Sequence, residues 1–151
     1  MKRIRNVFDE LLAFWESNQE QLQLDYPGIN FNILLITFSD YFEIPCDNDF
    51  LKSIYYRPQF NSFKSKLQLG TPINYLLQNR FFYNSNFYLN NHVLIPRFET
   101  ELLVDEALKL ANKFKNNSTF KLAEIGVGSG NVTLSLLVEL SDMAAIEAHG
   151  Y

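Results

Sequence analysis

The sequence has little that is typical of a secreted, disulfide-bonded protein or of a membrane protein. Cys46 is its only cysteine, so no disulfide can form within the chain, and nothing suggests a secreted disulfide scaffold. No apolar run approaches the roughly 18 residues of a membrane span. Residues 1–18 mix charged with apolar residues and lack the apolar core and cleavage site of a signal peptide. We therefore expect a cytoplasmic protein with no membrane partner.

The sequence also lacks an excess of positive charge. It contains 13 Lys and Arg residues against 17 Asp and Glu residues, a formal net charge of −4. That balance supplies no overall field to hold a phosphate backbone, so we expect no direct nucleic acid partner. The 14 Phe and 8 Tyr residues are numerous enough for a base-stacking surface, but burial in a core explains them better.

What the sequence does contain is helical periodicity through its first seventy residues. Apolar residues recur at the spacing of one helical face, and charged residues lie mostly on the other. Helices are expected at residues 4–15, at 31–42, after Asp47 or Asp49, and from Pro58 to Gly70. We predict a small helical N-terminal domain over residues 1–69, with a role in substrate recognition.

The pattern changes to that of strands from Arg80 onward. Residues 81–83 and 87–89 predict a β-hairpin, with its turn at Asn84, Ser85 and Asn86. Pro96 prevents the short extended run before it from continuing as a central strand. We therefore expect residues 70–98 to be a linker that carries a hairpin.

A helix, a strand, a glycine turn, a second helix and a second strand are then expected in that order. Thr100 can cap a helix that runs to about Phe114, with an apolar stripe of Leu103, Val104, Ala107, Leu108 and Ala111. The later elements are expected at residues 120–125, at 132–140 with Leu134, Leu137 and Val138 inside, and at 144–151. The fold class is α/β, and residues 99–151 form the incomplete start of a Rossmann-like domain.

The turn between strand and helix contains Gly126, Gly128 and Gly130. Glycine is needed where a chain reverses sharply, and the missing side chain lets a ligand touch the backbone while N–H groups of the helix face it. A triple-glycine turn can also be purely structural. Its position between strand and helix favours a ligand at the carboxyl end of the strand.

The residues around the glycines indicate which ligand. Asn131 stands where a dinucleotide fingerprint requires Gly or Ala, which disfavours NAD and FAD, and no Lys followed by Ser or Thr indicates a P-loop. Glu124 followed by the alternating glycines resembles motif I of the S-adenosylmethionine-dependent methyltransferases. That cofactor carries an amino acid end and a sulfonium but no phosphate, so a nearby carboxylate is tolerated.

Three further segments resemble one methyltransferase family. Residues 93–101 read Val-Leu-Ile-Pro-Arg-Phe-Glu-Thr-Glu, similar to the Ile-Pro-Arg-Pro-Glu-Thr-Glu signature of the release-factor protein-(glutamine-N5) methyltransferases. Residues 70–76 and 80–83 resemble that family's Gly-x-Pro-x-x-Tyr-Leu and Arg-x-Phe-Tyr stretches. The resemblance covers about residues 30–140 and implies a helical N-terminal domain, a hairpin linker and a methyltransferase domain.

The resemblance implies a function and a set of site residues. Members methylate the side-chain amide of the glutamine in the Gly-Gly-Gln loop of class I peptide chain release factors, with S-adenosylmethionine as donor. The implied cofactor-binding residues are Glu124, Gly126, Val127, Gly128, Ser129 and Gly130, and no metal is implied. Arg97, Glu99 and Thr100 would lie beside the substrate, although an interdomain ion pair explains Arg97 and Glu99 equally well. Phe98 and Val127 depart from the family, which usually has proline and threonine there.

The family's Asn-Pro-Pro-Tyr motif, which binds the glutamine amide, is absent from these 151 residues. The acidic residue expected to hold the ribose is absent too. We therefore expect a fragment of a longer, monomeric protein that transfers no methyl group by itself, rather than the product of a truncated gene. Two alternatives stay open: a glutamine methyltransferase for a ribosomal protein, and a non-catalytic helical module that binds a protein.

Overall fold

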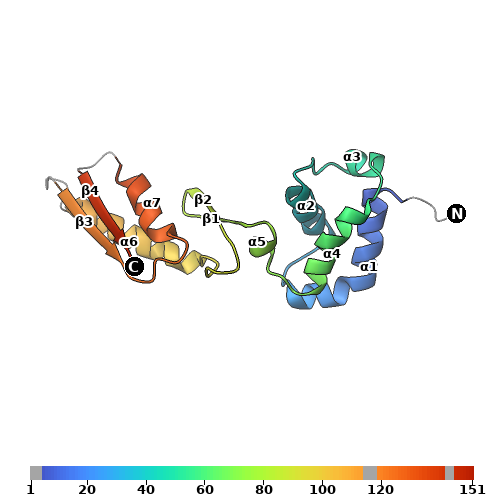
Figure 1. Cartoon of the computed structure of the whole chain (residues 1–151), viewed down its shortest axis with the longest axis horizontal. Helices are drawn as coiled ribbons and strands as arrows, with labels where there is room; N and C mark the ends of the chain where they lie inside the picture. Colours follow the sequence, from blue (N-terminus) through green and yellow to red (C-terminus); the bar gives the residue numbers. More distant parts are fainter. Residues whose placement is uncertain (1–4, 114–118, 142–144) are drawn as a thin grey trace. The chain divides into compact units, whose positions relative to one another are not determined.

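The computed structural model describes residues 5–113, 119–141 and 145–151 (Figure 1). The chain forms two compact units, of which the first ends at Leu77 and the second begins at Gln78. We call them the helical unit and the α/β unit. Ile4, Phe114 and Ala144, which the sequence placed in predicted elements, lie outside the described residues. The predicted division into a substrate-recognition domain, a linker and the start of a methyltransferase domain, with boundaries at residues 69 and 98, stays a prediction.

The helical unit contains the four predicted helices and one that was not predicted. The predicted helices are α1 (Val7–Asp25), α2 (Phe31–Phe42), α3 (Asn48–Ser53), and α4 (Asn61–Gln68) after the 3₁₀ turn η1 (Pro58–Phe60). The short helix α5 (Ile73–Leu76) lies where only linker was expected. Helix α1 continues well past its predicted end at Trp15, because Glu, Gln and Leu residues after it favour helix without adding a periodic apolar face. No helix within the described ranges is long and apolar enough to cross a membrane.

Side-chain caps fix where these helices begin. The side chains of Asn6, Asn30 and Asp47 accept hydrogen bonds from backbone N–H groups two or three residues into α1, α2 and α3, at 2.8, 3.0 and 2.8 Å. Such a cap satisfies one of the N–H groups that a helix start leaves without a partner. Asp47, and not Asp49, is therefore the cap of the third helix.

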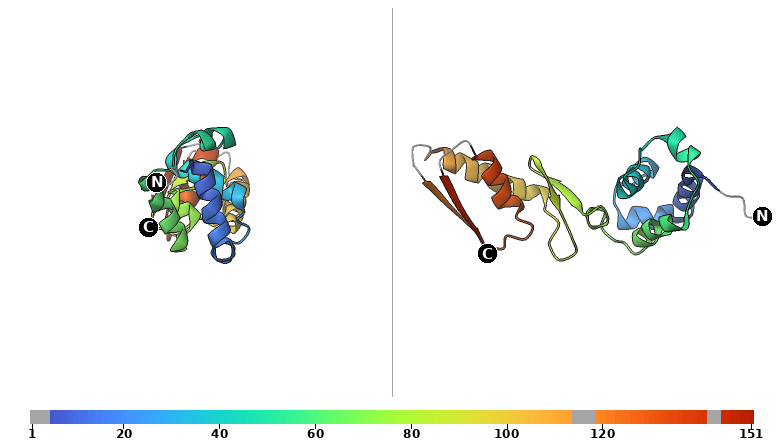
Figure 2. Two further views of the ribbon diagram at one scale, coloured as in Figure 1. Left: turned by 90° about the vertical axis from the view of Figure 1, so that its right-hand side faces the viewer. Right: turned by 45° about the horizontal axis from the view of Figure 1, so that its top comes forward.

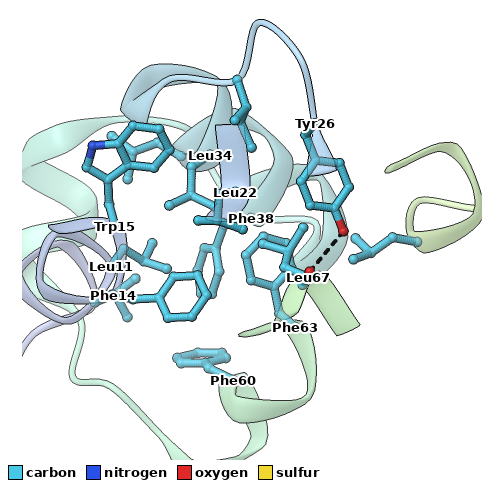
Figure 3. Close-up of a cluster of buried hydrophobic side chains, with 14 of the residues drawn as sticks. Leu11, Phe14, Trp15, Leu22, Tyr26, Leu34, Phe38, Phe60, Phe63 and Leu67 are labelled. Atoms are coloured by element: carbon cyan, nitrogen blue, oxygen red, sulfur yellow. Dashed lines mark hydrogen bonds between the residues drawn. The ribbon is translucent and has the colours of Figure 1, made fainter. Parts of the chain in front are cut away.

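An aromatic core holds the helical unit together (Figure 3). Phe38 is fully buried, and its ring lies 4.8, 5.3 and 5.2 Å from the rings of Phe42, Phe60 and Phe63. Aromatic pairs at these distances and tilts add to the stabilisation from burial. In this unit the aromatic residues do form a core, as predicted.

Tyr26 ties the end of α1 to the end of α4. Its hydroxyl lies 3.0 Å from the carbonyl oxygen of Leu67, drawn in Figure 3, and 2.9 Å from that of Thr71. Burial, reinforced by the charge of Asp25, raises the pKa of Tyr26 to about 12. The hydroxyl therefore stays protonated as a donor well into the alkaline range.

We expect Tyr26→Phe to cost about 1 kcal/mol of unfolding free energy near neutral pH, the typical net value of a hydrogen bond. The substitution should also change how the free energy of unfolding falls at alkaline pH. An unfolded chain ionises tyrosine near pH 10, whereas folded Tyr26 resists until about 12, so wild-type stability contains a component that is lost as pH rises across that interval. Urea denaturation at several pH values should show the variant converging on the wild type there. Parallel profiles would contradict the assignment.

The α/β unit begins with a hairpin whose turn differs from the prediction. Strands β1 (Asn79–Phe82) and β2 (Ser85–Tyr88) pair antiparallel, with Phe82 opposite Ser85. The turn is therefore Tyr83–Asn84, and the prediction of Asn84 to Asn86 was wrong. Tyr83 has φ 53°, in the left-handed region, whereas Asn84 has no positive φ. This conformation is unfavourable for tyrosine, and contacts described below hold it.

The rest of the unit is a helix followed by a parallel strand–helix–strand unit. The elements are the 3₁₀ turn η2 (Phe98–Thr100), α6 (Glu101–Lys113), β3 (Thr119–Glu124), α7 (Asn131–Glu139) and β4 (Ala145–Gly150). Strands β3 and β4 pair in parallel from Thr119–Ala145 to Glu124–Gly150 and lie side by side in Figures 1 and 2. This confirms mixed helix and sheet of the α/β kind, and the wider Rossmann-like sheet stays a prediction.

Two helices of this unit differ in detail from the prediction. Thr100 does not cap α6, because it is the last residue of the 3₁₀ turn that leads into the helix. Leu103 of α6 is exposed, whereas Val104 is fully buried. In α7 the predicted inner residues Leu134 and Val138 are exposed, Leu137 is only half-buried, and the buried apolar residues are Val132 and Leu136.

The hairpin explains which face of α7 is inside. Phe82 and Phe87, whose rings lie 6.1 Å apart at 80°, form one buried cluster with Val104, Val132 and Leu136. A helix buries the face that its neighbours cover, and sequence periodicity could not show that the hairpin covers this one. The outer face of the sheet is polar, since Glu147 pairs there with Lys121 at 3.3 Å and His149 at 3.0 Å.

Candidate cofactor-binding site

The glycine turn joins the end of β3 to the start of α7. Gly126, Gly128 and Gly130 have φ values of 77°, 54° and 76°, all in the left-handed region that favours glycine. A Cβ added at Gly126 would meet no atom within 4 Å, and one at Gly128 only the Gly126 carbonyl oxygen at 3.9 Å. The turn is thus shaped by backbone conformation, and the space beside its first two glycines is open to a ligand.

The turn rests on the end of β4. The N–H groups of Gly126 and Val127 donate to the carbonyl oxygen of Tyr151 at 2.8 and 3.1 Å, and the Tyr151 N–H donates to the Glu124 carbonyl at 2.9 Å. A Cβ on Gly150 would lie 2.8 Å from Cγ2 of Val127, so only glycine fits under that valine. The backbone N–H of Val127, predicted to contact the cofactor, is used here within the protein.

Glu124 is anchored by one carboxylate oxygen. Its Oε2 accepts from the backbone N–H of Thr133 at 3.0 Å and from the Thr133 hydroxyl. Its Oε1 has no hydrogen-bond partner within the described part of the chain. The half-buried carboxylate is thereby held at the carboxyl end of β3 with one acceptor oxygen left for a ligand. Sequence reasoning missed Thr133, because only the fold brings it beside Glu124.

The start of α7 adds donors to this edge. The first N–H groups of a helix have no intrahelical acceptor, which applies here to Asn131 and Val132. Ser129 donates from its hydroxyl to Oδ1 of Asn131 at 2.9 Å, and Gly130 donates to the carbonyl of Val127 at 2.8 Å. The predicted residues, Glu124 and 126–130, thus lie around one open edge of the sheet.

The signature residues form a separate segment. Arg97 and Glu99 are exposed, and neither forms an ion pair with any residue that the structure describes. Thr100 is half-buried, and its N–H donates to the Arg97 carbonyl at 3.0 Å. Phe98, where the family has proline, is 70% exposed. No hydrogen bond joins this segment to the glycine turn across the described ranges.

The arrangement suits a ligand with an amine and a polar body. Open space at two glycines, a Glu124 oxygen and the first helix N–H groups, the latter two without partners among the described residues, lie at one edge of the sheet. Among the described residues, no group of three or more His, Cys, Asp or Glu side chains is placed to hold a metal. These features fit a ligand that brings a positively charged amine close to the Glu124 carboxylate.

Comparison with known proteins adds a second kind of support. No family model matches the chain. A release factor glutamine methyltransferase of Dictyoglomus turgidum is 39% identical over 74 residues, 49% of this chain and 25% of the relative. One of Borreliella burgdorferi is 44% identical over 71 residues, 47% of this chain and 24% of the relative. One of Buchnera aphidicola is 35% identical over 100 residues, 66% of this chain and 35% of the relative. The matches therefore span about a quarter to a third of these relatives.

Proposed function

Because about half of this chain resembles release factor glutamine methyltransferases, we propose that it supplies the cofactor-binding front part of such an enzyme. The observation that carries the proposal is the glycine turn with Glu124 anchored beside it by Thr133. The cofactor is S-adenosylmethionine, which supplies an electrophilic methyl group. Glu124 and residues 126–130 hold its amino acid end at the carboxyl edge of β3.

The proposed substrate is the glutamine side-chain amide of the Gly-Gly-Gln loop in a class I peptide chain release factor, in the cytoplasm. This part of the proposal rests on the names of the relatives and on the signature segment. Arg97 and Glu99 are exposed and free of ion pairs with described residues, so both can meet a polar substrate loop. The names of these relatives favour a release factor over a ribosomal protein.

The role of this chain's own residues is binding and orientation. Glu124 neutralises the cofactor's ammonium with its free oxygen while Thr133 keeps the carboxylate from rotating. The glycine turn admits the cofactor against the backbone, where side chains would exclude it. An amide nitrogen is a poor nucleophile, and the 151 residues contain no Asn-Pro-Pro-Tyr motif to orient it. We accordingly propose that this chain binds the cofactor weakly and transfers no methyl group.

Calorimetric titration of the full chain with S-adenosylhomocysteine, the stable product of the cofactor, tests the site. Glu124→Gln keeps an acceptor for Thr133 but removes the charge, so we expect the dissociation constant to rise about tenfold, the loss of one charge-assisted hydrogen bond. Glu106→Gln makes the same change at an exposed glutamate of α6 paired with Lys109, and should leave affinity unchanged. Equal affinities for both variants would rule out Glu124 as a cofactor residue.

A methyl-transfer assay tests the remainder of the proposal. The chain, incubated with labelled S-adenosylmethionine and an unmodified release factor, should give no label above background. Robust labelling of the release factor would contradict the proposal that this chain lacks transfer activity. Labelling of the release factor by a longer version that includes the Asn-Pro-Pro-Tyr motif, and not of a ribosomal protein, would support the proposed substrate.

A further inference from the structure

We propose that Tyr83, in the turn of the β1–β2 hairpin, is a positioning residue that fixes the start of α6 and braces the start of α7 at the glycine turn. The contacts of Tyr83 do not depend on the proposed function. The identity of the ligand at the glycine turn rests on that proposed function.

Tyr83 is bound twice to the beginning of α6. Its backbone N–H donates to Oε1 of Glu101 at 3.0 Å, and its hydroxyl donates to Oδ1 of Asp105 at 2.9 Å. Glu101 and Asp105 are one turn apart on α6, so they present both carboxylates on one face. These two bonds hold tyrosine in the left-handed conformation that costs it free energy.

The same hairpin is bound to α7. The side-chain amide of Asn84, next to Tyr83, donates to Oε1 of Glu139 at 2.8 Å. On the other side of the turn, Phe82 packs in one buried cluster with Val132 and Leu136. Val132 is the second residue of α7 and follows the glycine turn almost directly. The hairpin therefore bridges the first turn of α6 and the whole length of α7.

The surroundings keep the Tyr83 hydroxyl a donor. Burial, the hydrogen bond to Asp105, and the charges of Asp105, Glu139 and Glu101 all raise its pKa. A protonated phenol can only donate to a carboxylate, so the Tyr83 hydroxyl remains the donor and Asp105 the acceptor at any ordinary pH. Tyr88 of β2, at the end of the hairpin away from the turn, is 68% exposed.

The position of the two helices matters for the site. Glu101 follows the signature residues Arg97 to Thr100 without a gap, so a loosened Glu101 loosens the segment proposed to meet the substrate. Val132 follows the glycine turn, so a loosened hairpin removes packing from the helix that the turn begins. The expected effect of Tyr83 on the glycine turn and the signature segment therefore runs through Glu101 and the packing of α7.

Amide hydrogen exchange of the intact chain tests this directly, with Tyr83→Phe as the variant and Tyr88→Phe as the matched control on the same hairpin. We expect Tyr83→Phe to speed exchange about tenfold in the first hydrogen-bonded turns of α6 and α7, through local opening, and to leave β3 and β4 unchanged. Tyr88→Phe should change neither. Unchanged exchange in Tyr83→Phe, or a uniform rise across residues 78–151, would overturn the positioning role.

The partner on α6 provides a second check. Asp105→Asn keeps an oxygen acceptor for the Tyr83 hydroxyl and should retain slow exchange, whereas Asp105→Leu should reproduce the effect of Tyr83→Phe. Equal exchange in both Asp105 variants would contradict the hydrogen bond's role. S-adenosylhomocysteine titration separates the two proposals: Tyr83→Phe should bind about tenfold more weakly than the wild type. If the wild type does not bind at all, the proposed function fails while exchange still decides the role of Tyr83.

Discussion

Replacing Phe38 by alanine should lower the free energy of unfolding of the helical unit by about 4 kcal/mol, as expected for removing a buried aromatic ring from a packed core. The ring is fully buried and contacts three other aromatic rings. Because typical domains are stable by only about 5–15 kcal/mol, a loss of this size leaves the unit close to unfolding.

Urea denaturation followed by tryptophan fluorescence measures this effect in the helical unit alone. Trp15 is the only tryptophan, and it is 92% buried in the same core, with 8% of its surface exposed. Ile36→Ala on the same helix is the control, because Ile36 is 49% exposed and should cost less than about 1 kcal/mol. A Phe38→Ala midpoint as high as that of Ile36→Ala would mean that Phe38 is not central to the core.

The second large effect is expected at the glycine turn. Gly130→Val should destabilise the start of α7 by about 3 kcal/mol, from left-handed strain on a β-branched residue together with crowding. Gly130 has φ 76°, and a Cβ there would lie 3.3 Å from Cδ1 of Leu134. Since about 1.4 kcal/mol corresponds to a factor of ten, hydrogen exchange of the α7 amides should become more than a hundredfold faster. Binding of S-adenosylhomocysteine should be lost.

Gly130→Asn separates the two causes. Asparagine tolerates the left-handed conformation but brings the same Cβ against Leu134, so it should show only the smaller cost of the contact. We expect α7 exchange in this variant to rise by less than about tenfold, roughly 1 kcal/mol. If asparagine is as damaging as valine, crowding by Leu134 and not backbone strain determines why glycine is needed here.

Local signals in the sequence predicted most of the helical unit and the glycine turn. Apolar periodicity and capping residues such as Asp47 act within a few residues, so they can be read without the fold. The prediction of the α7 face failed because its burial is decided by Phe82 and Phe87, about fifty residues earlier in the chain. The predicted hairpin turn was displaced from the observed one because Tyr83 adopts a positive φ, which is more common for Asn. Its hydrogen bonds to α6 stabilise that conformation.

The candidate site shows the same limit. Glycine spacing and an acidic residue predicted which residues surround the turn, and the structure brings Glu124 and residues 126–130 together at one edge. Neither Thr133 on the Glu124 carboxylate nor Tyr151 under the turn has a sequence signal, because each contact depends on how α7 and β4 return to β3. The outward Glu147 of β4 likewise meets Lys121 only once the strands are in register.

The bonds from Gly126 and Val127 to the carbonyl of Tyr151 have a consequence for how the molecule assembles. The residues of the glycine turn are neighbours in sequence, whereas Tyr151, which accepts their hydrogen bonds, lies some twenty-five residues later, after α7. Parallel pairing of β3 with β4 is a non-local contact that cannot begin until the crossover through α7 is complete, and non-local pairing is slow compared with forming a local helix. We therefore expect the glycine turn to acquire its fixed shape late in folding, when β4 docks, after α7 has formed.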